Sequence, residues 1–149
     1  MKERIASGAF TPPVTNSWCK SRLVVEIQGK SVPCRSSWDA AFHIVNPNFL
    51  YEDVRISYTF DGRERNYIVD FHDSDNRILY EIKPDCNKSD PIVIAKEAAA
   101  LEWCDKNGYK FEFVSESWFF ENRERWSQAS KQQPQGELIE RRLKQFLND

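Results

Sequence analysis

The chain has 149 residues and nearly balanced charge, with 21 Lys and Arg against 23 Asp and Glu. Its 40% apolar content is enough for one domain to bury a core, which excludes a disordered chain. No apolar run has the length of a membrane span or signal peptide, so we expect a cytoplasmic protein with no membrane partner. The four cysteines form no C-x-x-C pair, which argues against a zinc ribbon and favours reduced thiols.

The charge is distributed unevenly along the chain. Residues 1–38 carry six Lys and Arg against two acids, whereas residues 39–116 carry nine against sixteen. An acidic middle behind a basic arm (residues 1–34) fits a metal site beside a segment that contacts phosphate, with Lys20 and Arg22 as candidate contacts. An ordinary solvated arm explains the same charge equally well.

Periodicity and turn signals predict the secondary structure in chain order. Ser36 or Ser37 is a suitable N-cap for a helix that stops at Asn46-Pro47, and Asp61-Gly62 is a strong two-residue hairpin turn. The predicted elements are a short strand at 22–28, a helix from 36 or 37 to 45, strands at 52–60, 65–71 and 77–83, a helix at 92–106, a strand at 110–115, a helix at 118–130 and an amphipathic helix at 137–147.

These elements predict an α/β fold with a mixed sheet. The three strands between residues 52 and 83 form an antiparallel meander. The step from the third of them through the helix at 92–106 to the strand at 110–115 is a crossover that sets those two strands parallel. We divide the chain into the basic arm at 1–34, a core at 35–130, and a linker with the last helix at 131–149, all in one domain.

The strands at 66–71 and 77–83 carry charges inside apolar runs. If Asp75-Asn76 is a two-residue turn, the hairpin register places Asp70 directly opposite Glu81, with Lys83 on the same face. The opposite face then carries Val69, Phe71, Ile78, Tyr80 and Ile82. Two acids on a half-buried sheet repel each other unless a divalent cation compensates them. A strand-end acid and a simple Glu-Lys ion pair are the structural alternative.

The order of elements, with Val69-Asp70 and Glu81-Ile82-Lys83 in adjacent strands, resembles the PD-(D/E)XK nuclease superfamily, which has the restriction-endonuclease-like αβββαβ core; extra helices follow at the C-terminus here. Valine stands where the family name has proline. The stretches R-S-S-W-D at 35–39, Y-E at 51–52, Y-I-V-D-F at 67–71 and Y-E-I-K-P at 80–84 are similar to a branch of phage and mobile-element nucleases. That branch includes phage homing endonucleases, head-completion nucleases and the TnsA transposition endonuclease.

The resemblance implies roles for individual residues. Asp70, Glu81 and the Ile82 backbone carbonyl would bind Mg²⁺, for which Mn²⁺ would substitute, and Lys83 would act on the attacking water or the phosphate. Asp39 stands where the branch has a helix glutamate, although an acid in a first turn also suits the helix dipole.

Further residues are weaker candidates. Arg35, Lys88 and Lys96 are candidate phosphate contacts and equally plausible surface charges. His72 is a candidate general base, as in nicking enzymes of the mismatch-repair Vsr type, although a histidine in a turn is more often only solvated.

The implied function is Mg²⁺-dependent cleavage of DNA, in homing, genome processing or branched-DNA cleavage, in the host cytoplasm if a phage encodes the protein. The alternative is a DNA-binding or virion assembly module that keeps the fold without cutting. Since double-strand cleavage by one small site usually needs a second copy, a homodimer through the helix at 137–147 is a further hypothesis.

Overall fold

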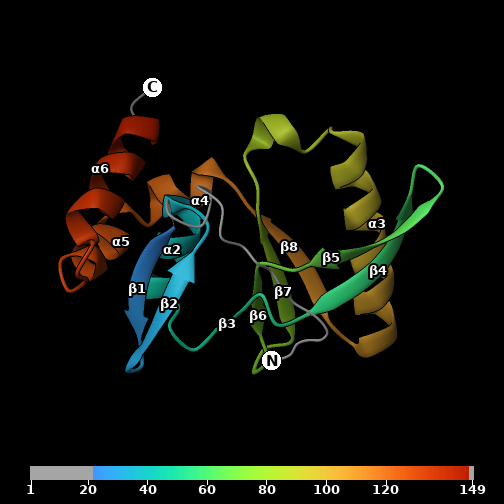
Figure 1. Ribbon diagram of the computed structural model, residues 1–149, viewed down its shortest axis with the longest axis horizontal. Coiled ribbons are helices and arrows are strands. Elements are labelled where there is room, and N and C mark those ends of the chain that lie inside the picture. The colour runs from blue at the N-terminus through green and yellow to red at the C-terminus, as the bar shows by residue number, and fades with distance from the viewer. Residues whose placement is uncertain (1–21, 148–149) are drawn as a thin grey trace.

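The computed structural model describes residues 22–147, so most of the predicted basic arm, including Lys20, lies outside the described residues. The fold is mixed α/β, with helices on both faces of a central sheet (Figure 1). That sheet has the order β3-β6-β7-β8, built from β3 (Leu50–Tyr51), β6 (Phe71–Asp73), β7 (Ile78–Ile82) and β8 (Lys110–Val114). The first three strands pair antiparallel and β8 pairs parallel to β7, which confirms the predicted mixed sheet and crossover.

Two separate two-stranded ribbons flank this sheet. One joins β1 (Leu23–Ile27) to β2 (Lys30–Cys34), and the other joins β4 (Arg55–Phe60) to β5 (Arg63–Ile68). Asp61 and Gly62 both have positive φ, at 57° and 72°, as the predicted two-residue hairpin turn requires. β2 was not predicted, because its sequence K-S-V-P-C has little apolar alternation and contains a proline, which fits an edge strand.

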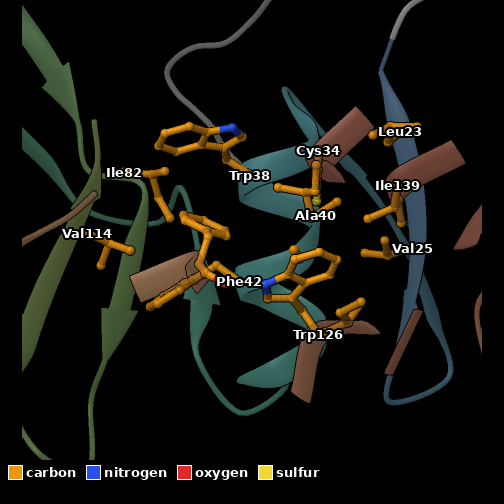
Figure 2. Close-up of a cluster of buried hydrophobic side chains, with 14 of the residues drawn as sticks. Leu23, Val25, Cys34, Trp38, Ala40, Phe42, Ile82, Val114, Trp126 and Ile139 are labelled. Carbon is orange, nitrogen blue, oxygen red and sulfur yellow. Dashed lines mark hydrogen bonds between the residues drawn. The ribbon is translucent and has the colours of Figure 1, made fainter. Parts of the chain in front are cut away.

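Helix α2 (Ser37–Val45) lies at the centre of the larger core. It begins where predicted, with Ser36 as N-cap accepting a hydrogen bond from the Asp39 amide. Figure 2 shows its side chains Trp38, Ala40 and Phe42 between Leu23 and Val25 of β1 on one side and Ile82 and Val114 of the central sheet on the other. Burial of these side chains holds α2 between the ribbon and the sheet.

A second core lies on the opposite face of the sheet, under helix α3 (Pro91–Asn107). The helix begins with Asp90 as N-cap and Pro91 at its first position, and it ends at Gly108, which has φ of 73°. Leu79 of β7 packs here with the inner face of the β4–β5 ribbon, including Ile56, Tyr58 and Tyr67. A short 3-10 turn, η1 (Asp85–Asn87), links β7 to α3.

The C-terminal part consists of α4 (Glu116–Glu121), α5 (Arg123–Ser130) and α6 (Gly136–Leu147). The predicted helix at 118–130 is therefore interrupted at Asn122, whose side chain bonds the Trp118 carbonyl. Between α5 and α6, the Gln133 and Gln135 side chains accept hydrogen bonds from the Glu26 and Val24 amides at 2.7 and 2.6 Å. These glutamines cover the outer edge of β1, which would otherwise present free backbone groups.

The predicted continuous strand at 66–71 is wrong, and so is the simple meander. The chain bends at Val69 and Asp70, so that β5 pairs with β4 and β6 pairs with β7. At this bend, the Asp70 carboxylate accepts the Ile82 amide of the neighbouring strand at 2.8 Å, in place of a backbone carbonyl. The bend also places the Val69 side chain on the opposite face of the sheet from the one predicted. Val69 packs with Leu79 in the second core, whereas Phe71 lies in the larger core.

Candidate active site

The charged residues of the predicted motif surround one cavity of about 350 Å³. It lies between the start of α2, the segment after β3, strand β5, the end of β7 and helix α3. Its wall contains four carboxylates, from Asp39, Glu52, Asp70 and Glu81, and three cationic side chains, from Arg35, Lys83 and Lys96. Segments separated by up to 61 positions, from Arg35 to Lys96, thus supply one site.

Asp70 and Glu81 form the buried centre of the site. The observed pairs Phe71–Tyr80 and His72–Leu79 have the register that places Asp70 opposite Glu81, as predicted. Burial, followed by the nearby charges of Glu81 and Asp39, raises the pKa of Asp70 well above its ordinary range. Burial also raises the pKa of Glu81, although hydrogen bonds from Tyr67 and Asp70 and the charge of Lys83 oppose this shift.

Backbone and tyrosine donors fix the orientation of the carboxylates. The Tyr67 hydroxyl donates to Glu81 Oε1 at 2.6 Å, and the Tyr51 hydroxyl donates to Asp39 Oδ2 at 2.7 Å. Burial raises the pKa of Asp39 to about 6, against the lowering effect of the Tyr51 hydrogen bond. The first turn of α2 thus holds Asp39 buried at the cavity wall rather than on a solvated helix end.

The cations lie around this acidic centre. Lys83 Nζ is 3.7 Å from Glu81 Oε2, and Lys96 Nζ lies 5.5 Å from the centre of the Tyr67 ring. Arg35 Nε pairs with Glu52 Oε2 at 2.5 Å, and its side chain is 43% exposed. Glu52 also contacts this acidic centre, because its amide donates a hydrogen bond to the Asp70 carbonyl at 2.9 Å.

The donor set fits a hard divalent cation. Carboxylate oxygens are the ligands that Mg²⁺ and Mn²⁺ prefer, and a cation would offset both the burial of charge and the repulsion that raise the pKa values of Asp70 and Asp39. Within residues 22–147, no three His, Cys, Asp or Glu side chains are already arranged around one metal position. This agrees with the bonds to Tyr51, Tyr67 and the Ile82 amide, each of which engages one carboxylate oxygen.

The Ile82 backbone also belongs to this centre. Its amide bonds the Asp70 side chain. Since the N–H and C=O of a strand residue point to the same neighbour, we expect the Ile82 carbonyl to face Asp70 too.

Several predicted residues lie elsewhere. His72 does not line the cavity: its Nδ1 is 3.2 Å from Asp53, and its Nε2 is 2.9 Å from the Tyr109 hydroxyl. Lys88 pairs with Asp85 at 2.8 Å and lines a different hollow, near Tyr80 and Trp118. Arg22 is outside the cavity wall as well. Neither His72 nor Lys88 is therefore positioned to act at the acidic centre.

Three site residues were not singled out as functional from the sequence. Glu52 and Tyr51 belonged to the Y-E stretch of the resemblance, which was the only signal for them. Tyr67 belonged to the Y-I-V-D-F stretch of the resemblance but reads otherwise as an apolar strand residue, and no pattern shows that its hydroxyl meets Glu81. Such contacts come from the tertiary approach of β5 to the end of β7.

No family model, no curated protein and no solved structure matches the chain. The described residues include no helix that is both long enough and apolar enough to cross a membrane. Cys34, Cys86 and Cys104 are free thiols.

Proposed function

We propose that the protein is a Mg²⁺-dependent DNA endonuclease with the PD-(D/E)XK core, of the phage or mobile-element type. The observation that carries the proposal is the gathering of Asp39, Asp70, Glu81 and Lys83 at one cavity from three separate elements. A stability role alone gives no reason to bury mutually repelling carboxylates, whereas metal-dependent cleavage of a phosphodiester uses such a cluster to hold the cation.

In this proposal, Asp70, Glu81 and the Ile82 carbonyl hold the cation, with Asp39 close by. A divalent cation held there supplies Lewis-acid activation of water and compensates phosphate charge. Tyr67 and the Ile82 amide keep the two carboxylates oriented, so the site is formed before substrate arrives. Lys83 offsets negative charge that develops on the phosphoryl oxygens, where a positioned cation acts most strongly.

Arg35 and Lys96 are the proposed phosphate contacts. Both line the cavity, one before α2 and the other on α3, so they flank the acidic centre from two sides. A DNA backbone crossing the cavity would meet a cation on each side of the scissile phosphate. This arrangement offsets the repulsion between the phosphate and the acidic centre.

The test is a nicking assay on supercoiled plasmid with purified full-length protein. We expect Mg²⁺-dependent nicking by the native protein, and a loss of at least about 100-fold in Asp70→Ala, since removing a catalytic group usually has effects of this size. Asp75→Ala is the matched control, because Asp75 is an exposed acid in the turn of the same hairpin. It should cleave like the native protein.

Equal nicking by the native protein and Asp70→Ala would reject the site. DNA binding by both without Mg²⁺-dependent nicking would favour the DNA-binding or virion assembly module instead. A preference for RNA or four-way junctions in the same assay would change the substrate class and leave the chemistry in place.

A further inference from the structure

The β4–β5 ribbon has one covered face and one open face. Its inner side chains Ile56, Tyr58 and Tyr67 are buried against α3, and the turn of the ribbon projects beyond that helix (Figure 1). The outer side chains alternate with them and are exposed, among them Arg55, Ser57, Thr59, Asn66 and one acid, Glu64, opposite Thr59. The ribbon pairs with no strand of the central sheet.

The open face continues into the proposed active site. Ser57 stands directly opposite Asn66 in the ribbon, and Asn66 and Ile68 also line the acidic cavity. The outer face of the ribbon at Asn66 is therefore continuous with the wall of the acidic cavity. The ribbon also differs in charge from its surroundings: residues 55–68 carry three arginines against two acids, whereas the rest of residues 39–116 carries six basic residues against fourteen acids.

We infer that the outer face of the β4–β5 ribbon reads base edges in the major groove of duplex DNA bound at the cavity. The inference rests on the proposed function. The major groove admits a two-stranded β-ribbon, and short hydroxyl and amide side chains such as Ser57, Thr59 and Asn66 match its pattern of donors and acceptors. Arg55 on the same face adds a cation for the flanking phosphates.

The geometry also limits where the reading occurs. Five residues separate Asn66 at the cavity from Asp61 at the turn, which is about 16 Å at about 3.3 Å per strand residue. At about 3.4 Å per base pair, the ribbon covers about five base pairs. Any base preference of the ribbon should therefore fall within about five base pairs of the cut, on one side.

The experiment is cleavage of a duplex pool with randomised sequence in the presence of Mg²⁺, followed by sequencing of the product ends. The test variant is Ser57→Ala/Thr59→Ala, because both residues are exposed and neither lines the cavity. Ser74→Ala is the control, since it removes an exposed hydroxyl from the β6–β7 turn. Circular dichroism verifies that each variant is folded.

The native protein and Ser74→Ala should show the same base preference within about five base pairs of the cut. Ser57→Ala/Thr59→Ala should lose about 5- to 150-fold discrimination at one or more positions, the range of a base-edge contact. The ribbon inference would be overturned if the native protein cleaved with no base preference within about five base pairs of the cut, or if the double variant kept the native preference. Either result would leave the nuclease proposal unaffected.

If the native protein does not cleave, the nuclease proposal fails on its own. The same pool then serves in a binding selection without Mg²⁺. Enrichment of a sequence by the native protein that the double variant does not enrich supports the ribbon as a reading surface. Absence of duplex binding, or equal enrichment by both proteins, overturns it.

Discussion

Asp70 and Glu81 place two carboxyl groups where water cannot solvate both. Such a pair is stable only if it keeps a proton or takes up a cation, and burial raises the pKa values of both groups accordingly. In the proposed function, protons and divalent cations therefore compete for the same oxygens. Both the stability of the protein and the proposed cleavage should then depend on pH.

Stability of the metal-free protein should fall as pH rises through the range in which the buried acids ionise. Asp39 has a pKa of about 6 in the folded protein against an ordinary 3.8, so between about pH 4 and pH 6 the native state holds a proton that the unfolded chain has released. The free energy of unfolding then decreases by about 2–3 kcal/mol across this interval. Urea unfolding in chelator at about pH 4.5 and pH 6.5 measures it.

The Asp39→Asn variant isolates this contribution, since asparagine still accepts the Tyr51 hydrogen bond. As pH rises, the free energy of unfolding of Asp39→Asn should increase relative to that of the native protein. Asp75→Asn, which changes an exposed acid, should follow the native protein. A constant difference between Asp39→Asn and the native protein at all pH values would contradict the assignment.

At the scale of elements, the junction of α5 and α6 depends on Gly136. A Cβ at this position would overlap the backbone carbonyl of Ser130, which is itself buried. Gly136→Ala should therefore push α6 away from α5 and lower the free energy of unfolding by about 1–3 kcal/mol, as overpacking does. Thermal unfolding measures it, with the exposed neighbour Glu137→Ala as control. Equal melting temperatures in both variants would show that the junction adapts without cost.

Elements with local signals were predicted well. The Asp61-Gly62 turn, the caps of α2 and α3 and the parallel step from β7 to β8 follow from short-range rules. The break between β5 and β6 does not follow from such rules, because it involves a bond from the Ile82 amide to the Asp70 side chain twelve positions away.

The candidate site shows the same difference between local and tertiary signals. A hairpin register is enough to bring Asp70 to Glu81, whereas Tyr67 and Glu52 arrive through tertiary packing.

For the whole molecule, the amphipathic helix α6 closes the larger core. Its Ile139, Leu143 and Leu147 are buried within the chain, and Phe146 packs edge-on against Trp38 at 4.6 Å. The hypothesis of a homodimer through α6 remains a prediction. Such a dimer would have to use the polar side of α6 and the exposed part of Phe146, because Ile139, Leu143 and Leu147 are already buried.

Binding of Mg²⁺ should raise the stability of the whole molecule. A ligand that binds only the native state at 100 times its Kd adds about 2.7 kcal/mol, which is a shift of about 5–10 °C in melting temperature for a chain of this size. In Asp70→Asn the shift should disappear. Without Mg²⁺ this variant should melt above the native protein, because the repulsion with Glu81 and Asp39 is gone.

Differential scanning fluorimetry with Mg²⁺ or chelator measures both effects, and Asp75→Asn serves as the control. A Mg²⁺ shift of equal size in Asp70→Asn would place the cation elsewhere in the molecule.

Glu52 adopts φ of 57°, a left-handed conformation in which residues other than glycine are strained, while its amide bonds the Asp70 carbonyl and its carboxylate holds Arg35. Glycine would relax this backbone and remove the carboxylate at the same time. Mutagenesis aimed only at thermostability would therefore favour glycine here and remove the carboxylate that pairs with Arg35. If Arg35 contacts a DNA phosphate as proposed, the more stable protein obtained in this way would bind DNA less tightly.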